Sequence, residues 1–385
     1  MIVVFLSPAF PPTAAAFCAA LARAGATVLG IGDEPWRKSA IEAAGLTEYV
    51  YEPRMAEHQP LHDAVAALRA RFGRIDRIDS NGERWLEDEA RLRDDFDVPG
   101  LRSEPLRRQR SKLGMGELFA AQSIAYPPTV SAANPTAVRR LAEKYGFPLV
   151  FKPDVGSGAV GTHTVQREGD LVAALESEPQ SYVVQPFISD RIVTFDGLAD
   201  REGRPVFWTS HAYDTGIMQV RTGKLDGSYH SLRELPAGLE ELGRRAVAAF
   251  DVRERFFHVE FFQLPDQSFV ALEMNLRPPG GFTTDMMNAA CNVDVYALWA
   301  ALMLGHDLSN FRFERPYHTA HAGRRAERRY RLDSATLRRE LGPTLIAEHP
   351  IPPQFADTMG DTMFMLRHEH LAALERAIAL VQSRV

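Results

Sequence analysis

The chain has 385 residues, of which 45% are hydrophobic, so it is long enough to form two or three domains with separate cores. Its 44 Lys and Arg residues against 50 Asp and Glu residues give a net charge of only -6, which provides no electrostatic basis for binding nucleic acid or an anionic membrane. Two cysteines without metal-ligand spacing, and no apolar run of signal-peptide or membrane length, predict a cytoplasmic protein with small-molecule partners.

The first hundred residues alternate between short apolar runs and helix-like segments. The runs 2–6 and 27–31 predict buried strands on either side of an Ala-rich helix from about Ala14 to Arg23. A further strand is expected at 75–78, after a second helix-like segment. Strand, helix and strand in this order predict a right-handed parallel crossover. We therefore expect a Rossmann-like α/β domain over residues 1–103.

Two loops of this domain follow predicted strands directly. They are 7–13 and 80–83, and both would lie at the carboxyl edge of the sheet, where open α/β folds tend to bind ligands. Ordinary turn chemistry is nevertheless the favoured interpretation of both loops, with ligand contact as the alternative.

A second pattern begins after a proline-bearing break near residue 100. Asn134 followed by Pro135 predicts the start of a helix, because Asn caps a helix and Pro suits its first turn. Gly146 ends that helix, and residues 148–152 continue as a strand that carries Lys152.

A glycine-rich loop follows this strand and matches the three-glycine pattern of dinucleotide-binding loops. It consists of Gly156, Ser157, Gly158, Ala159, Val160 and Gly161. A dinucleotide-binding loop should open a helix, but the β-branched alternation at 162–165 predicts a strand. The loop therefore joins two strands, and its amides, with the charge of Lys152, suit phosphate oxygens. A surface hairpin with a solvated lysine is the alternative.

A hairpin is predicted where two strand-like runs, 256–262 and 269–276, flank a polar turn. If Asp266 and Gln267 are the central turn residues, Glu260 lies opposite Glu273, with Cβ atoms about 5 Å apart. Facing carboxylates repel unless a proton or a cation lies between them, so the pair predicts a divalent metal.

Strand alternation extends this interpretation along the second strand of the hairpin. Glu273, Asn275 and Arg277 should project from one face, and the intervening Leu272, Met274 and Leu276 from the other. Two carboxylates and an amide oxygen are ligands that suit Mg²⁺, with Mn²⁺ as a substitute, whereas Zn²⁺ prefers Cys and His. An ordinary solvated sheet face is the alternative.

The order of these motifs resembles the ATP-grasp superfamily, and most closely its carboxylate-amine ligase branch, which includes amino-acid ligases. The resemblance covers about residues 1–310 and rests on Lys112, Lys152, the glycine loop, the segment 182–188, Glu260 and the run 273–277. It implies a small ATP-grasp subdomain at 104–187 with the glycine loop and a large one at 188–310 with the metal site. A C-terminal subdomain of unassigned role would follow at 311–385.

The resemblance also implies site roles, which we carry over residue by residue. The implied ATP contacts are Lys112, Lys152, Gly156, Ser157, Gly158, Ala159, Val160, Gly161, Gln185, Pro186, Phe187 and Ile188. The implied magnesium ligands are Glu260, Glu273 and Asn275, and the implied catalytic residue is Arg277. The ribose contact stays unassigned, because Gln185 stands where an acidic residue is frequent in the family and Asp190 to Ile192 replace the usual Gly-x-Glu.

The predicted reaction is ATP-dependent joining of a small carboxylate and an amine, with amino acids as the expected pair. It would proceed through an acyl phosphate and release ADP and phosphate. A small-molecule kinase on the same scaffold and a non-catalytic nucleotide-binding protein are the alternatives. Specificity is expected from the segment 213–229 and from the N-terminal domain. Homo-oligomer formation stays open, and the basic cluster at 324–329 is interpreted as a solvated face rather than a nucleic-acid site.

Overall fold

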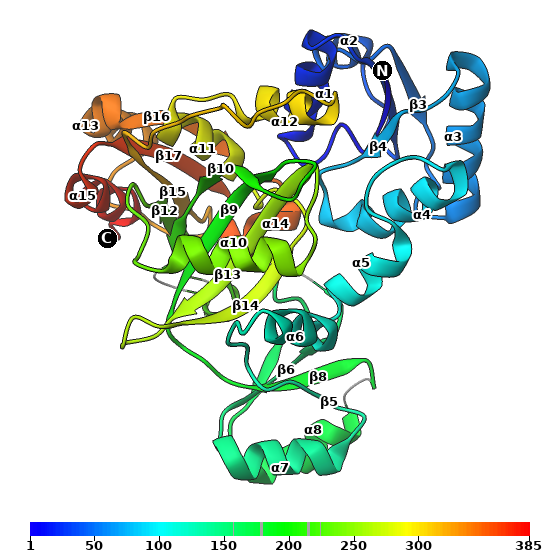
Figure 1. Ribbon diagram of the computed structural model, residues 1–385. Helices are drawn as coiled ribbons and strands as arrows, with labels where there is room; N and C mark the ends of the chain where they lie inside the picture. The colour runs from blue at the N-terminus through cyan, green and yellow to red at the C-terminus, as the bar shows by residue number, and fades with distance from the viewer. Residues whose placement is uncertain (157, 178–179, 214–215, 224) are drawn as a thin grey trace.

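The computed structural model describes residues 1–385 with the exception of 157, 178–179, 214–215 and 224. Its strands form three sheets, and helices pack beside each of them (Figure 1). Within the described part of the chain, no helix is both long enough and apolar enough to cross a membrane. The mixed α/β class predicted from the sequence is confirmed.

The N-terminal region is built on a parallel sheet in the order β3-β2-β1-β4. Its elements are β1 (Ile2–Leu6), α1 (Ala14–Arg23), β2 (Thr27–Gly32), α2 (Lys38–Ala43), β3 (Glu48–Tyr51), α3 (His58–Phe72), β4 (Arg77–Asp79), the 3-10 helix η1 (Glu83–Trp85) and α4 (Leu86–Phe96). The parallel pairing of β1 with β2 confirms the crossover predicted through the Ala-rich helix.

A smaller antiparallel sheet, in the order β5-β8-β6-β7, follows in the chain. Its region contains α5 (Ser103–Arg110), α6 (Lys112–Ala121), β5 (Val130–Ser131), α7 (Pro135–Tyr145), β6 (Leu149–Pro153), β7 (His163–Val165), α8 (Glu168–Ser177) and β8 (Tyr182–Pro186). The Asn134 side chain accepts a hydrogen bond from the Ala137 amide at 3.0 Å, as the capping pattern predicted. The antiparallel pairing of β6 with β7 confirms that the glycine loop joins two strands.

The rest of the chain forms one nine-stranded sheet, ordered β14-β13-β9-β11-β12-β15-β17-β16, with β10 paired to β9. Its elements are β9 (Arg191–Ala199), β10 (Pro205–Thr209), β11 (His211–Tyr213), α9 (Ile217–Thr222), β12 (Ser228–Ser231), α10 (Leu239–Ala249), β13 (Arg255–Gln263), β14 (Phe269–Asn275), α11 (Thr283–Cys291), α12 (Val295–Met303), β15 (His318–Arg324), α13 (Ser334–Leu341), the 3-10 helix η2 (Gly342–Thr344), β16 (Leu345–Pro350), α14 (Pro353–Met359), β17 (Thr362–His368) and α15 (Leu371–Gln382). Strands from 311–385 thus extend the sheet of 188–310 through the pairing of β12 with β15.

The hairpin of β13 and β14 differs from the prediction in its turn. Leu264 and Ser268 are joined by a backbone hydrogen bond, so the loop has three residues, and Gln267 adopts a φ of 67°. The register then shifts between Glu260 and Phe261, where Leu272 forms a β-bulge. The predicted two-residue turn is wrong, but Glu260 still pairs with Glu273 because the bulge compensates for the longer loop.

The basic cluster at 324–329 is only in part the solvated face that was predicted, since Glu327 and Arg329 are exposed but the first two arginines are not. Arg324 and Arg325 are buried, at 7% exposure each. The Arg324 guanidinium donates to the Val381 and Leu332 carbonyls, and Arg325 donates to the carbonyls of Leu225, Ala356 and Asp357. Because these guanidinium groups are buried and hydrogen-bonded to backbone carbonyls, they link the C-terminal elements and do not present charge to a partner.

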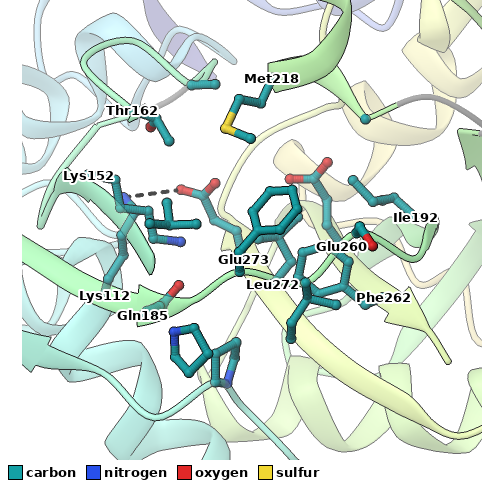
Figure 2. Close-up of a pocket in the computed structure, with 18 of the residues that line it drawn as sticks. Lys112, Lys152, Thr162, Gln185, Ile192, Met218, Glu260, Phe262, Leu272 and Glu273 are labelled. Atoms are coloured by element: carbon teal, nitrogen blue, oxygen red, sulfur yellow. Dashed lines mark ion pairs between the residues drawn. The ribbon is translucent and has the colours of Figure 1, made fainter. Parts of the chain in front are cut away.

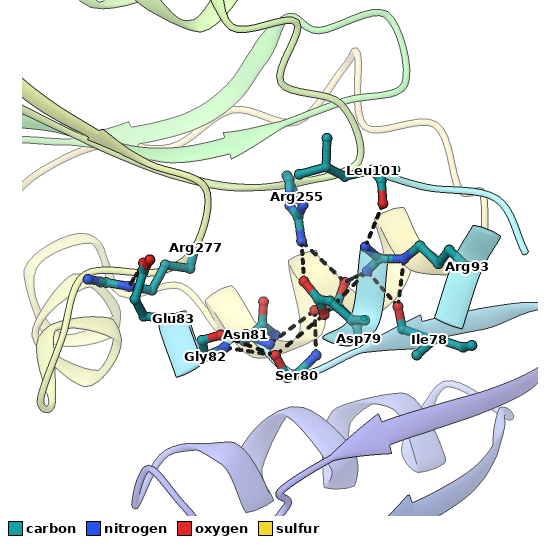
Figure 3. Close-up of polar contacts among 11 residues, drawn as sticks. Ile78, Asp79, Ser80, Asn81, Gly82, Glu83, Arg93, Leu101, Arg255 and Arg277 are labelled. Atoms are coloured by element: carbon teal, nitrogen blue, oxygen red, sulfur yellow. Dashed lines mark hydrogen bonds and ion pairs between the residues drawn. The ribbon is translucent and has the colours of Figure 1, made fainter. Parts of the chain in front are cut away.

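A buried polar network joins the N-terminal sheet to the large sheet (Figure 3). The Glu89 carboxylate pairs with Arg255 at 3.0 Å and with Arg93 at 3.3 Å, and Arg93 also pairs with Asp79 at 3.3 Å. Asp79 Oδ1 in turn accepts hydrogen bonds from the amides of Ser80 and Asn81. The network therefore fixes the loop after β4 relative to β13.

Glu89 gives this network a testable pH dependence. Burial raises the pKa of its carboxyl from 4.5 to about 7, although Arg93 and Arg255 oppose the shift. A raised pKa means that the folded state binds more protons than the unfolded state, so the stabilisation is complete below pH 4.5 and is lost as the pH rises through 7. Deprotonation of Glu89 should therefore contribute a decrease in the melting temperature of the wild type between about pH 5 and 7.5, roughly the interval between the unfolded and folded pKa values.

The Glu89→Gln variant should lack this pH-dependent decrease in melting temperature, because an amide does not titrate. Glu104→Gln is the matched control, since Glu104 is exposed on α5. Differential scanning fluorimetry at several pH values measures the effect. An unchanged pH slope in Glu89→Gln would contradict the assignment.

Candidate active site

Two adjoining cavities meet at the carboxylate pair. Cavity A has a volume of about 170 Å³ and lies between the small sheet and the edge of the large sheet (Figure 2). Cavity B, of about 580 Å³, lies beyond it and reaches the N-terminal loops and α14. Glu260 and Glu273 line both cavities. The pair therefore stands at the junction between a smaller and a larger binding space.

Cavity A collects most of the residues predicted to contact ATP. Those that line it are Lys112, Lys152, Gly156, Gly158, Ala159, Val160, Gln185, Pro186, Phe187 and Ile188. Gly161 does not line it; its φ is +71°, and a Cβ there would lie 2.5 Å from the Tyr182 hydroxyl oxygen, so this glycine serves close packing. Ser157 lies outside the described residues.

The floor of cavity A contains one residue that strand alternation assigned to the wrong face. Leu272 was predicted to point away from Glu273, yet both line cavity A, and Figure 2 shows them side by side with Phe262. The bulge at Leu272 explains the difference, because an extra residue interrupts the alternation of side chains. Met274 and Leu276 are in the core, as predicted.

Two buried lysines face this cavity. Burial, together with the charge of the nearby Lys112, lowers the pKa of Lys152 to about 8. The Lys112 ammonium donates to the carbonyls of Asp154 and Gly156 at 3.3 Å and lies 3.7 Å from Glu273 Oε1 (Figure 2). Two adjacent buried cations favour an anionic ligand, because a phosphate would relieve their repulsion.

The carboxylate pair has the donor chemistry of a magnesium site. Glu260 is 7% exposed, and burial raises the pKa of its carboxyl, with a further contribution from the charge of Glu273. Asn275 is buried and lines cavity B beside both glutamates. Among the described residues, no group of three or more His, Cys, Asp or Glu side chains could hold a metal. A cation here would therefore depend on two carboxylates, the Asn275 amide oxygen and oxygens of bound phosphate.

Behind the pair lies a buried carboxylate that sequence analysis missed. Asp196 on β9 accepts hydrogen bonds from Nδ1 of His211 at 2.7 Å and Nδ1 of His258 at 2.6 Å. Burial alone would raise the pKa of Asp196, but the two imidazoles lower it to about 2. His258 is thereby oriented so that its Nε2 lies 3.9 Å from Glu260 Oε1. A polar residue inside the apolar run 191–199 was the only sequence signal.

Arg277 lines cavity B and not cavity A. Its Nε donates to Glu83 Oε2 at 3.0 Å (Figure 3). Arg110 pairs with the other oxygen of Glu83 at 3.2 Å. Glu83 begins η1 directly after the loop that follows β4, and this loop lines cavity B together with residues of the loop after β1. The structure thus places both loops at the wall of cavity B.

Comparisons with known proteins found relatives in sequence and in fold, although no protein-family model matches the chain. It is 22% identical over 280 residues to the L-arginine-specific L-amino acid ligase of Bacillus subtilis, covering 67% of each protein. It is 28% identical over 158 residues to a pyruvate carboxylase subunit of Methanothermobacter thermautotrophicus, a match that spans 38% of this chain and only 31% of that relative.

Solved structures of similar fold cover nearly the whole chain. An L-amino acid ligase from Bacillus licheniformis superposes with a TM-score of 0.79 at 14% identity, covering 99% of this chain and 96% of that one. N5-carboxyaminoimidazole synthetase from Staphylococcus aureus gives a TM-score of 0.74 at 13% identity, covering 99% and 97%. The chain therefore shares the fold of these two solved structures over nearly its whole length.

Proposed function

We propose that the protein is an ATP-dependent carboxylate-amine ligase that joins two small molecules, with amino acids as the substrate class. The observation that carries this proposal is the meeting of cavities A and B at Glu260 and Glu273. A nucleotide in cavity A would direct its terminal phosphate toward a second substrate in cavity B. The similarity to amino acid ligases in sequence and fold supports the same substrate class.

Each side chain then has a role that follows from its position. Lys112 and Lys152 bind the phosphates of ATP, and the glycine loop covers them. Glu260, Glu273 and Asn275 would hold Mg²⁺, which would supply neutralisation of the phosphate charge. Arg277 stabilises the charge that develops on the transferring phosphoryl group and on the acyl phosphate.

The reaction needs no covalent enzyme intermediate. A carboxylate oxygen of the acid attacks the terminal phosphorus, and ADP leaves with the electrons of the broken P–O bond. The amine nitrogen then attacks the acyl carbon, phosphate leaves, and the nitrogen loses a proton. Positioning and charge neutralisation supply most of the catalysis.

The finer points of the proposal concern architecture and setting. We keep the division into a Rossmann-like domain at 1–103, ATP-grasp subdomains at 104–187 and 188–310, and a C-terminal subdomain at 311–385. We also propose that Mg²⁺ is the cofactor, that the protein is cytoplasmic and that it has no nucleic-acid partner.

A product assay tests the proposal directly. The protein is incubated with Mg-ATP and pairs of amino acids, and ADP, free phosphate and the condensed product are measured together. An amide formed in equal amount with ADP and phosphate supports ligation. A stable phosphoester without free phosphate would instead identify a kinase, and no ADP release with any pair would contradict both.

Lys152→Ala should raise the ATP concentration needed for half-maximal ADP formation by about tenfold to a hundredfold, because a charged hydrogen bond is worth roughly 1.5–3 kcal/mol. Lys152 is buried in cavity A, whereas Lys144 is exposed on α7 and serves as the control. Steady-state kinetics with varied ATP measures both variants. Equal effects of Lys152→Ala and Lys144→Ala would mean that Lys152 does not contact the nucleotide.

A further inference from the structure

Cavity B contains a row of stacked rings on one face of the large sheet. Tyr213 on β11 stacks on Tyr229 on β12 with ring centroids 4.6 Å apart, and Tyr229 stacks on His321 on β15 at 5.1 Å. Tyr229 and His321 are directly paired across the two strands. We call Tyr213, Tyr229 and His321 the aromatic row, and all three side chains line cavity B.

The aromatic row shares its face with the carboxylate pair. In strand order, Glu273 on β14 and Glu260 on β13 come first, then β9, and then the row on β11, β12 and β15. At about 4.8 Å per strand, β11 lies roughly 10 Å from β13. That distance suits a phosphoryl group and a carboxylate lying between the metal ligands and the rings.

The end of the cavity formed by the row carries no charge among the described lining residues. Burial lowers the pKa of His321 to about 4, so this ring is neutral near pH 7, and its Nε2 bonds to the Met359 carbonyl at 3.0 Å. The Tyr229 hydroxyl is bonded to the Thr283 hydroxyl. The acidic residues and arginines that line cavity B come from residues 83–110 or from the segment 258–277: Glu83, Arg84, Glu87, Arg110, Glu260, Glu273 and Arg277.

Helix α14 closes the cavity over this uncharged end. Phe355 stacks on Phe10 of the N-terminal loop, with centroids 5.3 Å apart. Met359 packs so tightly on the turn after β14 that a Cβ on Gly281 would lie 2.8 Å from its sulfur. Arg325 anchors α14 through the carbonyls of its last turn and leaves its own charge outside the cavity lining.

We propose that the aromatic row, Phe355 and Met359 form a subsite for the side chain of the acid substrate, and that the subsite selects an apolar side chain of branched-aliphatic or aromatic size. This inference rests on the proposed ligase function and assigns its acid partner. The carboxylate of the acid lies at the charged end, where it reaches the terminal phosphate, and its side chain lies between the row and α14. The C-terminal segment thus sets substrate specificity.

The test compares alanine, leucine, phenylalanine, glutamate and lysine as acids with one fixed amine. Leucine or phenylalanine should exceed glutamate and lysine in kcat/KM by about tenfold or more, since an apolar pocket leaves a charged side chain unpaired. Met359→Trp should fill the subsite and lower kcat/KM for phenylalanine about tenfold or more relative to alanine. Met359→Ala should shift the preference toward larger rings, with the KM for ATP unchanged.

Leu371→Ala is the control variant, because Leu371 is half-buried on α15 outside both cavities. It should leave the ratio of kcat/KM values among the acids unchanged. A preference for glutamate or lysine would overturn the proposal. The proposal would also be overturned if the ratios of kcat/KM among the acids were the same in both Met359 variants as in the wild type.

Binding measurements separate this proposal from the ligase function. Isothermal titration calorimetry with phenylalanine, in the presence of a non-hydrolysable ATP analogue and Mg²⁺, reports occupation of cavity B without turnover. Binding that Met359→Trp removes, without product from any acid and amine pair, would support the subsite and contradict the ligase. Amide formation only from acids with charged side chains would support the ligase function and contradict the subsite.

Discussion

Arg277→Ala should slow amide formation by roughly a hundredfold or more while ATP affinity changes little. One donor aimed at charge that develops in a transition state is typically worth about 3–4 kcal/mol. Arg277 lines cavity B beside Asn275 and does not line cavity A, so in the proposed reaction its guanidinium would face the reacting groups rather than the bound nucleotide. Losing it should therefore lower turnover more than binding.

A purely structural role makes a different prediction. Arg277 ties the end of β14 to the N-terminal region through its ion pair with Glu83. If this tie were its only role, Glu83→Gln, which weakens the ion pair but keeps Arg277, should reproduce the effect of Arg277→Ala. ATP affinity, melting temperature and amide formation should be measured on both variants. Normal turnover per folded molecule in Arg277→Ala would exclude the catalytic role.

Glu273→Gln should reduce metal-dependent ADP formation by about a hundredfold or more, since a bound metal contributes several kcal/mol to stabilising the transferring phosphoryl group. The fold should tolerate the change, because glutamine has the same shape and removes the repulsion between Glu273 and Glu260. The ion pair with Lys112 is lost as well, but at 3.7 Å it is a long contact.

Titration of ADP formation with Mg²⁺ and with Mn²⁺ measures this effect, and melting temperature checks the fold. Glu143→Gln, on the exposed face of α7, is the matched control. Full activity of Glu273→Gln at low Mg²⁺, or wild-type activity in excess chelator, would remove the metal assignment.

Local signals in the sequence carried much of the prediction. The cap at Asn134, the strand after the glycine loop and the pair Glu260–Glu273 depend on residues close together in the chain, and all three are found in the structure. Lys112 lies far from the glycine loop in sequence. Its place in the site was predicted from the family resemblance and not from a local pattern.

Other features depend on contacts that no short pattern encodes. The extension of the large sheet pairs Tyr229 with His321, which lie far apart in the sequence. Arg324 and Arg325 look like surface charge in sequence, because the carbonyls that bind them come from distant segments. The hydrogen bonds of Asp196 to His211 and His258 likewise join three strands, so composition alone could not reveal them.

The bulge at Leu272 has a consequence for how nucleotide affinity could change. A hairpin of the same length with a two-residue turn would also pair Glu260 with Glu273, but it would pair Phe261 with Leu272 instead of with Ala271. The two arrangements are register isomers that keep the metal ligands and exchange the apolar surface beneath cavity A. A substitution in the exposed turn that favours the two-residue form is therefore expected to alter nucleotide affinity at a distance while Glu260 and Glu273 stay paired.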